Sequence, residues 1–211
     1  ATPSRFTVYQ KFPSADAAEK RIFARFRKDG SLPLDGFDVD LTYNRGGIHR
    51  RTGLTPPTYK FDKVPQKADV QFSDVTKGTP LPDASQRSVL FDPPYQIRKP
   101  SSGADKSIRD VKDLGIFPDL PSAVNTWTSG VREASRILKR GGTFMVKIQD
   151  LQMDRGMQRK LSVPATQHII DTATRHGFSI VDKATKRNPH ARSSGKAART
   201  SFVNYIIFKK D

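Results

Sequence analysis

The sequence has no cysteine and only one tryptophan among its 211 residues. Without cysteine, the chain cannot form disulfide bonds, a zinc site built on thiolates or a thiol nucleophile. Long apolar runs are missing too: runs such as Tyr205–Phe208 are far shorter than a membrane-spanning helix, which needs about 20 apolar residues. Residues 1–4 start no apolar signal segment. We therefore expect a cytoplasmic protein with no membrane partner, and a nuclear or organellar location stays open.

Acidic residues are also scarce. The 21 Asp and Glu stand against 37 Lys and Arg, which gives a formal net charge of +16. Clustered Lys and Arg release counterions when they bind phosphates, so this excess predicts a nucleic-acid partner. A generally basic surface that serves solubility is the alternative interpretation.

Basic residues concentrate in one stretch near the end of the chain. Residues 183–199 contain no acidic residue, and Pro189 and Gly195 within them indicate a loop. We predict a flexible basic loop between two apolar strands that clamps phosphates, with a solvated excursion as the alternative. Its candidate phosphate-binding residues are Lys183, Lys186, Arg187, Arg192, Lys196 and Arg199.

Short strand-like runs recur along the chain, with fewer helical segments between them. Helices are expected over residues 16–28, 122–140, where Gly141-Gly142 is a stop signal, and 163–176, where Ser162 is the candidate N-cap. The seven expected strands are residues 37–40, 59–62, 70–74, 88–92, 143–148, 178–181 and 202–208. This order predicts an α/β fold: an open, mainly parallel sheet with helices on both faces, whose last two strands form an antiparallel hairpin at one edge.

The pattern shows no internal repeat and no domain boundary, so residues 1–211 are expected to form a single domain. Residues 1–35 form a helical extension before the first strand, and residues 98–121 form a long insertion after the fourth. A loop of that length inside a compact domain is usually functional. Arg98 and Lys99, at its start, are further candidates for phosphate contacts.

Four of the expected strands end in aspartate, at Asp40, Asp62, Asp74 and Asp92. Ligands of open α/β sheets bind outside the carboxyl ends of the strands, so these carboxylates are predicted to face one crevice. There they can accept hydrogen bonds from ribose hydroxyls or an amino group. A single aspartate after a strand is more often a turn former or a helix cap, but four in succession favour a binding site.

The sharpest motif is Asp92-Pro93-Pro94-Tyr95, which follows the apolar run 89–91. Two prolines cannot continue a strand, so they fix a rigid loop at the edge of the sheet while their carbonyls remain acceptors. The Asp92 carboxylate and a proline-fixed carbonyl together suit an amino group that donates two hydrogen bonds. Tyr95 can stack on the ring that carries the amine. These residues are the candidate catalytic group, and a proline-rich turn with a buried tyrosine is the alternative.

The motif resembles the catalytic tetrapeptide of S-adenosylmethionine-dependent amino-methyltransferases, which methylate adenine N6 or cytosine N4. The resemblance extends over residues 36–210. Asp40–Gly47 is similar to the family's first cofactor loop, and Gly141–Lys147 is similar to its turn into the fifth strand. Residues 147–150 resemble bacterial and phage DNA methylase-like proteins in particular. The resemblance implies a Rossmann-like class I methyltransferase fold with a seven-stranded sheet, in a bacterial or phage-infected cell.

The resemblance also implies a site for S-adenosyl-L-methionine. In it, Asp40 would lie near the cofactor's amino group, Asp62 would bind the ribose and Asp74 would read the adenine. Gly46 would let the backbone approach the methionine moiety. The residues carried over to the cofactor are Asp40, Thr42, Asn44, Gly46, Asp62 and Asp74.

The reaction implied is direct methyl transfer to the exocyclic amine of a nucleic-acid base, with adenine N6 in DNA favoured. It requires no metal, and His49, His168, His176 and His190 show no metal-ligand spacing. Asn44 departs from the family pattern, because it stands where the first glycine of a G-x-G turn would be; asparagine tolerates a left-handed backbone better than other non-glycine residues. An RNA base methyltransferase and a catalytically inactive nucleic-acid-binding or assembly protein on the same fold are the alternatives.

Overall fold

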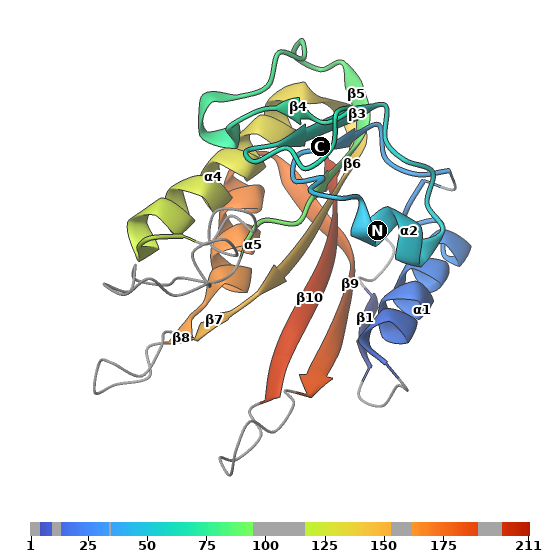
Figure 1. The fold of residues 1–211 in the computed structure, drawn as a ribbon. Helices are drawn as coiled ribbons and strands as arrows, with labels where there is room; N and C mark the ends of the chain where they lie inside the picture. The colour runs from blue at the N-terminus through green and yellow to red at the C-terminus, as the bar shows by residue number, and fades with distance from the viewer. Residues whose placement is uncertain (1–4, 10–13, 34, 95–116, 153–161, 190–199) are drawn as a thin grey trace.

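The structure is a computed structural model that describes residues 5–9, 14–33, 35–94, 117–152, 162–189 and 200–211 (Figure 1). The elements in chain order are β1 (Arg5–Tyr9), α1 (Ala15–Lys28), β2 (Val39–Asp40), α2 (Gly47–Thr52), β3 (Tyr59–Asp62), β4 (Gln71–Phe72), the short 3-10 helix η1 (Val75–Lys77), β5 (Gln86–Phe91), α4 (Leu120–Ile137), β6 (Leu138–Gln149), β7 (Leu151–Gln152), β8 (Ser162–Val163), α5 (Ala165–Arg175), β9 (Phe178–Pro189) and β10 (Thr200–Lys210).

One sheet organises the molecule. Its strand order is β1-β9-β10-β6-β5-β2-β3-β4, and β7 pairs separately with β8. Only β10 runs antiparallel to its neighbours in this sheet, so the predicted mainly parallel α/β architecture is confirmed. The sheet has eight strands rather than the predicted seven, because Arg5–Tyr9 adds a strand parallel to β9. The antiparallel hairpin β9–β10 forms as predicted but lies inside the sheet, since β1 covers its outer side.

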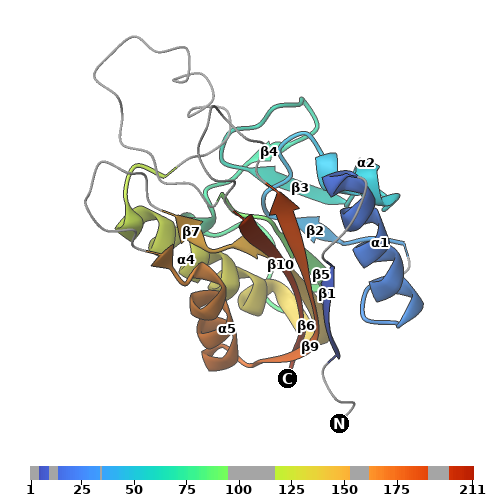
Figure 2. The same cartoon turned by 90° about the horizontal axis from the view of Figure 1, so that it is seen from below.

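Helices cover both faces of the sheet (Figures 1 and 2). On one face, α1 buries Ile22, Phe23 and Phe26 against a cluster that includes Leu90 and Tyr205. These apolar residues recur at helical spacing, and Ser14 caps the helix by accepting a hydrogen bond from the Ala17 main-chain N–H at 3.1 Å. The predicted helix at residues 16–28 is therefore confirmed.

On the other face, α4 and α5 pack over a larger cluster centred on Trp127, Phe144 and Phe208. Both helices are shorter than predicted. The chain leaves α4 after Ile137, because Leu138 already pairs with Gln86 of β5. At α5, Pro164 rather than Ser162 is the N-cap residue, because Ser162 pairs with Gln152 of β7.

Two predicted irregular segments contain regular structure. Residues 183–189 were expected in the basic loop, but they extend β9, whose main chain pairs with β1 on one side and β10 on the other. The predicted insertion over 98–121 also ends earlier, because Phe117 is buried against Trp127 and α4 begins at Leu120. The predictions for 98–116 and 190–199 lie outside the described residues.

Candidate functional site

The candidate site lies at the carboxyl ends of β2, β5 and β6. The chain adds β3 and β4 on one side of β2, and β5 and β6 on the other, so the strand order reverses between β2 and β5. Open α/β sheets bind ligands outside this switch point. The parallel register places Asp40 beside Leu90 and Phe91 beside Val146. Asp40, Asp92 and Lys147 therefore lie together at the carboxyl ends of these strands.

The loop after β2 is held by its own first residue. Asp40 is 2 % exposed, and its Oδ1 accepts a hydrogen bond from the Thr42 main-chain N–H at 2.9 Å. Its Oδ2 lies 2.8 Å from Nε2 of His49, which α2 presents to it. The His49 ring stacks on Tyr43, with centroids 5.4 Å apart. Asp40, predicted to lie near the cofactor's amino group, is thus a buried anchor for the cofactor loop.

The turn in this loop needs two left-handed residues. Asn44 has φ 49° and Gly46 has φ 70°. The left-handed backbone expected at Asn44 is therefore present. At Gly46 a Cβ atom would lie 2.4 Å from the Tyr43 hydroxyl oxygen, so any side chain there would displace the Tyr43 ring. In the structure the close neighbour of Gly46 is Tyr43.

Asp62 connects the end of β3 to the cofactor loop. Its Oδ2 accepts a hydrogen bond from the Asn44 main-chain N–H, and its Oδ1 accepts one from the Val64 N–H, both at 2.8 Å. Burial raises the pKa of Asp62 even though both hydrogen bonds oppose it. Each carboxylate oxygen keeps a second acceptor position, so Asp62 can still receive two hydroxyl groups.

Asp74, at the end of the acid series, has local partners. It caps η1: its Oδ1 accepts hydrogen bonds from the Thr76 main-chain N–H at 3.0 Å and from the Thr76 hydroxyl at 2.7 Å. Its Oδ2 lies 3.1 Å from Lys63 Nζ. Partial burial acts to raise the pKa of Asp74, but these hydrogen bonds and the lysine hold it below its ordinary value. Asp74 therefore shapes the loop that follows β4.

Asp92 joins the proline motif to the cofactor loop. Its main-chain N–H donates to the Thr42 hydroxyl at 2.7 Å, and its Oδ2 lies 3.3 Å from Lys147 Nζ. The side chain is 26 % exposed. Burial raises the pKa of Asp92, and the opposing charge of Lys147 does not cancel the effect. The structure therefore brings the motif and the first loop together through Thr42.

The rest of the motif is held from the opposite face of the sheet. The Trp127 indole N–H of α4 donates to the Pro94 carbonyl oxygen at 3.3 Å. Trp127 is fully buried, so it fixes the position of Pro94 and leaves that carbonyl already engaged. The Pro93 side chain is buried as well. Tyr95, the predicted stacking residue, lies outside the described residues.

A buried group of charges that the sequence analysis did not identify lies behind Asp92. Glu19 of α1 is 1 % exposed, and its Oε1 lies 3.1 Å from Lys147 Nζ. Tyr205 donates its hydroxyl to the same oxygen at 3.0 Å, and Arg51 donates its Nε–H to Oε2 at 2.6 Å. Burial acts to raise the pKa of Glu19, but Lys147 and Arg51 together lower it by more. A signal for Glu19 was available: it occupies an otherwise apolar position of α1, one turn before Ile22 and Phe23.

The described part of the predicted basic loop, residues 183–189, divides its side chains between the two faces of the sheet, because side chains alternate along β9. Lys186 is 6 % exposed and lies on the α1 side, where the charges of Glu19, Lys147 and Arg51 act on it. Burial lowers its pKa. Lys183 and Arg187 point to the opposite side, and Arg187 is exposed. Arg98, Lys99, Arg192, Lys196 and Arg199 lie outside the described residues.

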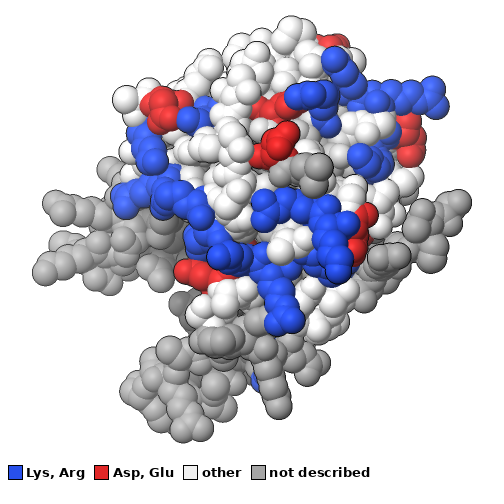
Figure 3. Space-filling model, turned by 90° about the vertical axis from the view of Figure 1, so that its right-hand side faces the viewer, with Lys and Arg blue, Asp and Glu red and all other residues white. Residues whose placement is uncertain are grey.

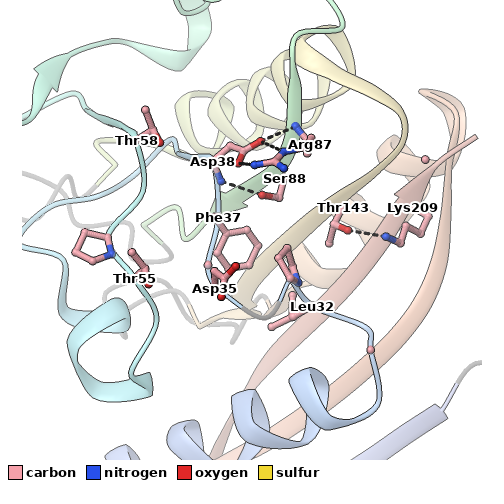
Figure 4. Close-up of a pocket in the computed structure, with 15 residues that line it drawn as sticks. Leu32, Asp35, Phe37, Asp38, Thr55, Thr58, Arg87, Ser88, Thr143 and Lys209 are labelled. Atoms are coloured by element: carbon pink, nitrogen blue, oxygen red, sulfur yellow. Dashed lines mark hydrogen bonds and ion pairs between the residues drawn. The ribbon is translucent and has the colours of Figure 1, made fainter.

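A hollow of about 500 Å³ (Figure 4) lies at the amino ends of the parallel strands, whereas Asp92 follows the carboxyl end of β5. Its lining includes Asp38, Ser88 and Thr58, which are shown in Figure 4. Asp38 pairs with Arg87 at 3.1 Å, and Lys209 donates to the Thr143 hydroxyl at 2.7 Å. This hollow therefore lies beside the amino ends of β2 and β5, where Asp38 and Arg87 pair with each other.

Within the described part of the chain, no cluster of three or more His, Asp or Glu could hold a metal ion. No helix in that part is both long and apolar enough to cross a membrane.

Comparisons with known proteins identify the fold. No protein-family model matches the sequence, and no curated protein matches it either. A SAM-dependent methyltransferase from Thermotoga maritima is 16% identical over 93% of this chain and 90% of its own, with a TM-score of 0.53. The cyclase SpnF is 14% identical over 90% of this chain and 80% of its own, with a TM-score of 0.51. At these identities the likeness shows the fold alone: this chain has the predicted methyltransferase fold.

A third similar structure is a protein from Thermus thermophilus that is named as a DNA modification methylase and was solved with S-adenosyl-L-methionine. It is 20% identical over 65% of this chain, with a TM-score of 0.44. This chain spans about half of that protein's length, with 53% covered.

Proposed function

We propose that this protein transfers a methyl group from S-adenosyl-L-methionine to the exocyclic amine of a nucleic-acid base, most favourably adenine N6 in DNA. One observation carries the proposal: at the switch point of a methyltransferase fold, Asp92 and the cofactor loop are joined through Thr42. Asp92, which would accept a hydrogen bond from the amine, and the loop implied to hold the methyl donor are therefore neighbours.

The residues at this edge fit the cofactor chemically. Asp62 keeps one acceptor position on each oxygen after its main-chain hydrogen bonds, which suits the two hydroxyls of a ribose. His49 supports the fit, since its Nδ1 is buried without a hydrogen-bond partner among the described residues. A buried polar atom of this kind is costly unless a ligand or water satisfies it. Asp62 would hold the ribose, and the Asn44–Gly46 turn would lie under the methionine moiety.

The chain's own groups would hold and deprotonate the amine. S-adenosyl-L-methionine, when bound, supplies a methyl group already activated by the positive charge on sulfur. Asp92 and the Pro93 carbonyl oxygen would each accept one N–H of the amine, which turns the nitrogen lone pair toward the methyl group. As nitrogen gains the methyl group it must lose a proton, and Oδ1 of Asp92, the oxygen not facing Lys147, would take it. A raised pKa suits Asp92 to this task.

Charge supports a nucleic-acid substrate over a small molecule. The net charge of +16 favours a polyanion, because each neutralised phosphate releases counterions. In duplex DNA the target base would have to leave the stack before it reached Asp92, at a cost of a few kcal/mol. Contacts between basic side chains and the backbone offset that cost. A single strand carries no such penalty, so DNA and RNA oligonucleotides both belong in the assay.

Calorimetric titration with S-adenosyl-L-methionine tests the proposal first. We expect saturable binding that Asp62→Ala weakens by about tenfold or more, since a charge-assisted hydrogen bond contributes about 1.5–3 kcal/mol. Asp171→Ala is the matched control, because this exposed carboxylate on α5 pairs only locally, with Gln167. A labelled-methyl assay on DNA and RNA then identifies the polymer and the base. A folded protein that binds no cofactor would contradict the proposal and favour the inactive nucleic-acid-binding alternative.

A further inference from the structure

The outer surfaces of α1 and α2 carry an excess of positive charge. Together the two helices contain seven Lys and Arg against two Asp and Glu, whereas α4 and α5 contain three against two. Figure 3 shows Lys and Arg side chains gathered on the α1–α2 side of the molecule. We call this surface the basic helix face and define it by the exposed side chains of Lys20, Arg21, Lys28, Arg45 and Arg50.

The acidic residues of these helices do not neutralise the basic helix face. Glu19 points inward and is buried beside Lys147. Asp16, which is exposed, lies 3.4 Å from Arg51, and α2 contains no acidic residue. Among the described residues, Lys20 and Lys28 have no carboxylate partner within 4.0 Å, and the partner of Arg45 is the amide of Gln66. Like charges gathered in this way repel one another, so an anionic partner would stabilise them.

The basic helix face begins at the candidate site. Glu19, in the second turn of α1, contacts Lys147, which in turn contacts Asp92. Arg51 of α2 also contacts Glu19, and Arg27 ties the two helices together by donating to the Thr52 carbonyl oxygen at 2.9 Å. The helices that carry the basic helix face are therefore connected to Asp92 through Glu19 and Lys147.

We infer that the basic helix face binds the phosphate backbone of the nucleic acid whose base is presented to Asp92. The inference rests on the proposed function for the identity of the polyanion. Lys and Arg on this face contact backbone phosphates, which positions the polymer without reading its sequence. Lys20 and Lys28 lie two turns apart on one side of α1, about 12 Å along the helix axis. That separation lets them contact different phosphates of one strand.

A nucleic acid suits this surface better than an anionic membrane does. Helices that lie on a membrane insert an apolar face between the lipids. The apolar residues of α1, including Ile22, Phe23 and Phe26, are instead buried against the sheet. The large exposed apolar side chains of the described chain are Val8, Tyr59, Phe72 and Phe202, and none of them belongs to α1 or α2. The basic helix face therefore offers charge without an apolar anchor.

The salt dependence of duplex binding tests the inference, because the slope of log K against log salt falls by about 0.9 for each phosphate that the protein no longer neutralises. The test variant is Lys20→Gln with Lys28→Gln. The matched control is Lys77→Gln with Lys139→Gln, which removes two exposed lysines from the α4 side. Both variants change the net charge equally. Binding of a labelled duplex of about 20 base pairs is followed by fluorescence anisotropy at several salt concentrations.

We expect the test variant to weaken duplex binding about tenfold in low salt and to lower the slope by about 1–2, while the control changes the affinity less than about twofold. Equal losses in both variants would mean that net charge alone binds DNA, and would overturn the inference. The inference would also be overturned if the test variant bound the duplex normally and lost binding only to vesicles of anionic phospholipid. The affinity for S-adenosyl-L-methionine, measured on the same samples, reports folding and the cofactor site. The two hypotheses are thus tested separately: loss of cofactor binding would contradict the proposed function, and equal duplex binding by the two variants would contradict the role of the basic helix face.

Discussion

The two ends of the parallel strands, called here the amino edge and the carboxyl edge of the sheet, differ in how their charged residues are arranged. At the amino edge, beside the hollow of about 500 Å³, Asp38 pairs with Arg87, whose side chain is 80% exposed. At the carboxyl edge, Lys147 lies between Glu19 and Asp92, and the side chains of these three residues are 12%, 2% and 26% exposed. The hollow has an arginine that water can solvate, whereas the candidate site holds charges that depend on each other. Under the proposed function, buried and mutually dependent charge marks the site better than the hollow does.

The comparison is tested most strongly by removing the same charge at each edge. We expect Asp92→Asn to lower methyl transfer by about 10²–10³-fold, since the uncharged amide cannot take the proton that the amine loses and no longer stabilises the positive charge that develops on it. Asp38→Asn, the matched change at the amino edge, should leave the rate within about twofold. Initial rates in the labelled-methyl assay decide between them. Equal losses at both edges would contradict the assignment of the site.

The Asp92→Asn variant also separates a role in function from a role in stability. Because the folded pKa of Asp92 lies above its ordinary value, its contribution to stability is favourable only in acid and is lost as pH rises through the folded pKa. At pH values above the folded pKa the ionised Asp92 is therefore a cost, and there Asp92→Asn should unfold at the same or a higher urea concentration than the natural chain. A clear fall in the urea midpoint would instead make Asp92 a structural residue.

The second prediction concerns the charge behind Asp92. Glu19→Ala should reduce the free energy of unfolding by about 3 kcal/mol, because it leaves Lys147 and Arg51 without their buried partner. The folded pKa of Glu19 lies below its ordinary 4.5. Its contribution is therefore present at neutral pH and is lost as pH falls through the folded pKa, so the variant should also lose part of its acid sensitivity.

Urea unfolding of the Glu19→Ala variant at several pH values measures both effects. Glu19→Gln is the control, since it keeps the shape and can still accept from Tyr205; we expect a smaller loss. A loss below about 1 kcal/mol, as for an exposed pair, would show that the buried cluster does not stabilise the fold.

A smaller effect is expected in the cofactor loop, where the backbone at Asn44 is left-handed. Asn44→Val should cost about 1–2 kcal/mol, because a β-branched residue is strained in that conformation. Asn44→Gly relieves the strain, so it should keep both stability and cofactor affinity. Thermal unfolding and calorimetry measure the two quantities. Cofactor binding that appeared only in the glycine variant would show that the asparagine side chain blocks the site.

The smallest effect is expected at the amino edge. Arg87→Ala should leave the urea midpoint almost unchanged, because the Arg87–Asp38 pair is formed by a largely exposed arginine and solvent weakens it. Urea unfolding tests this. A loss as large as that of Glu19→Ala would remove the distinction between the two edges.

The sequence by itself determined the class of fold and the position of the main motif. Apolar runs at strand spacing and an amphipathic pattern in α1, α4 and α5 were sufficient, because burial of one face dictates that periodicity. Asp92-Pro93-Pro94 follows β5 as predicted, since two prolines in succession cannot donate the main-chain hydrogen bonds that would continue a strand inside the sheet. The predicted end of the strand at residue 181 was wrong. β9 continues through Lys183 and Lys186 because strands on both sides pair with it, and a basic composition does not reveal such partners.

The tertiary structure decided which of the charged residues act together. Asp40 and Asp62 each end a strand and Asp74 follows β4 by two residues, yet Asp40 is buried against His49 and Asp74 caps η1. Lys147 lies in the predicted strand and Trp127 in the core, and each also contacts the proline motif: Lys147 contacts Asp92, and Trp127 donates to the Pro94 carbonyl oxygen. Glu19 reaches the site from the far end of the chain, through α1. Such contacts join residues distant in sequence, and only the packing of helices on the sheet brings them within hydrogen-bond distance.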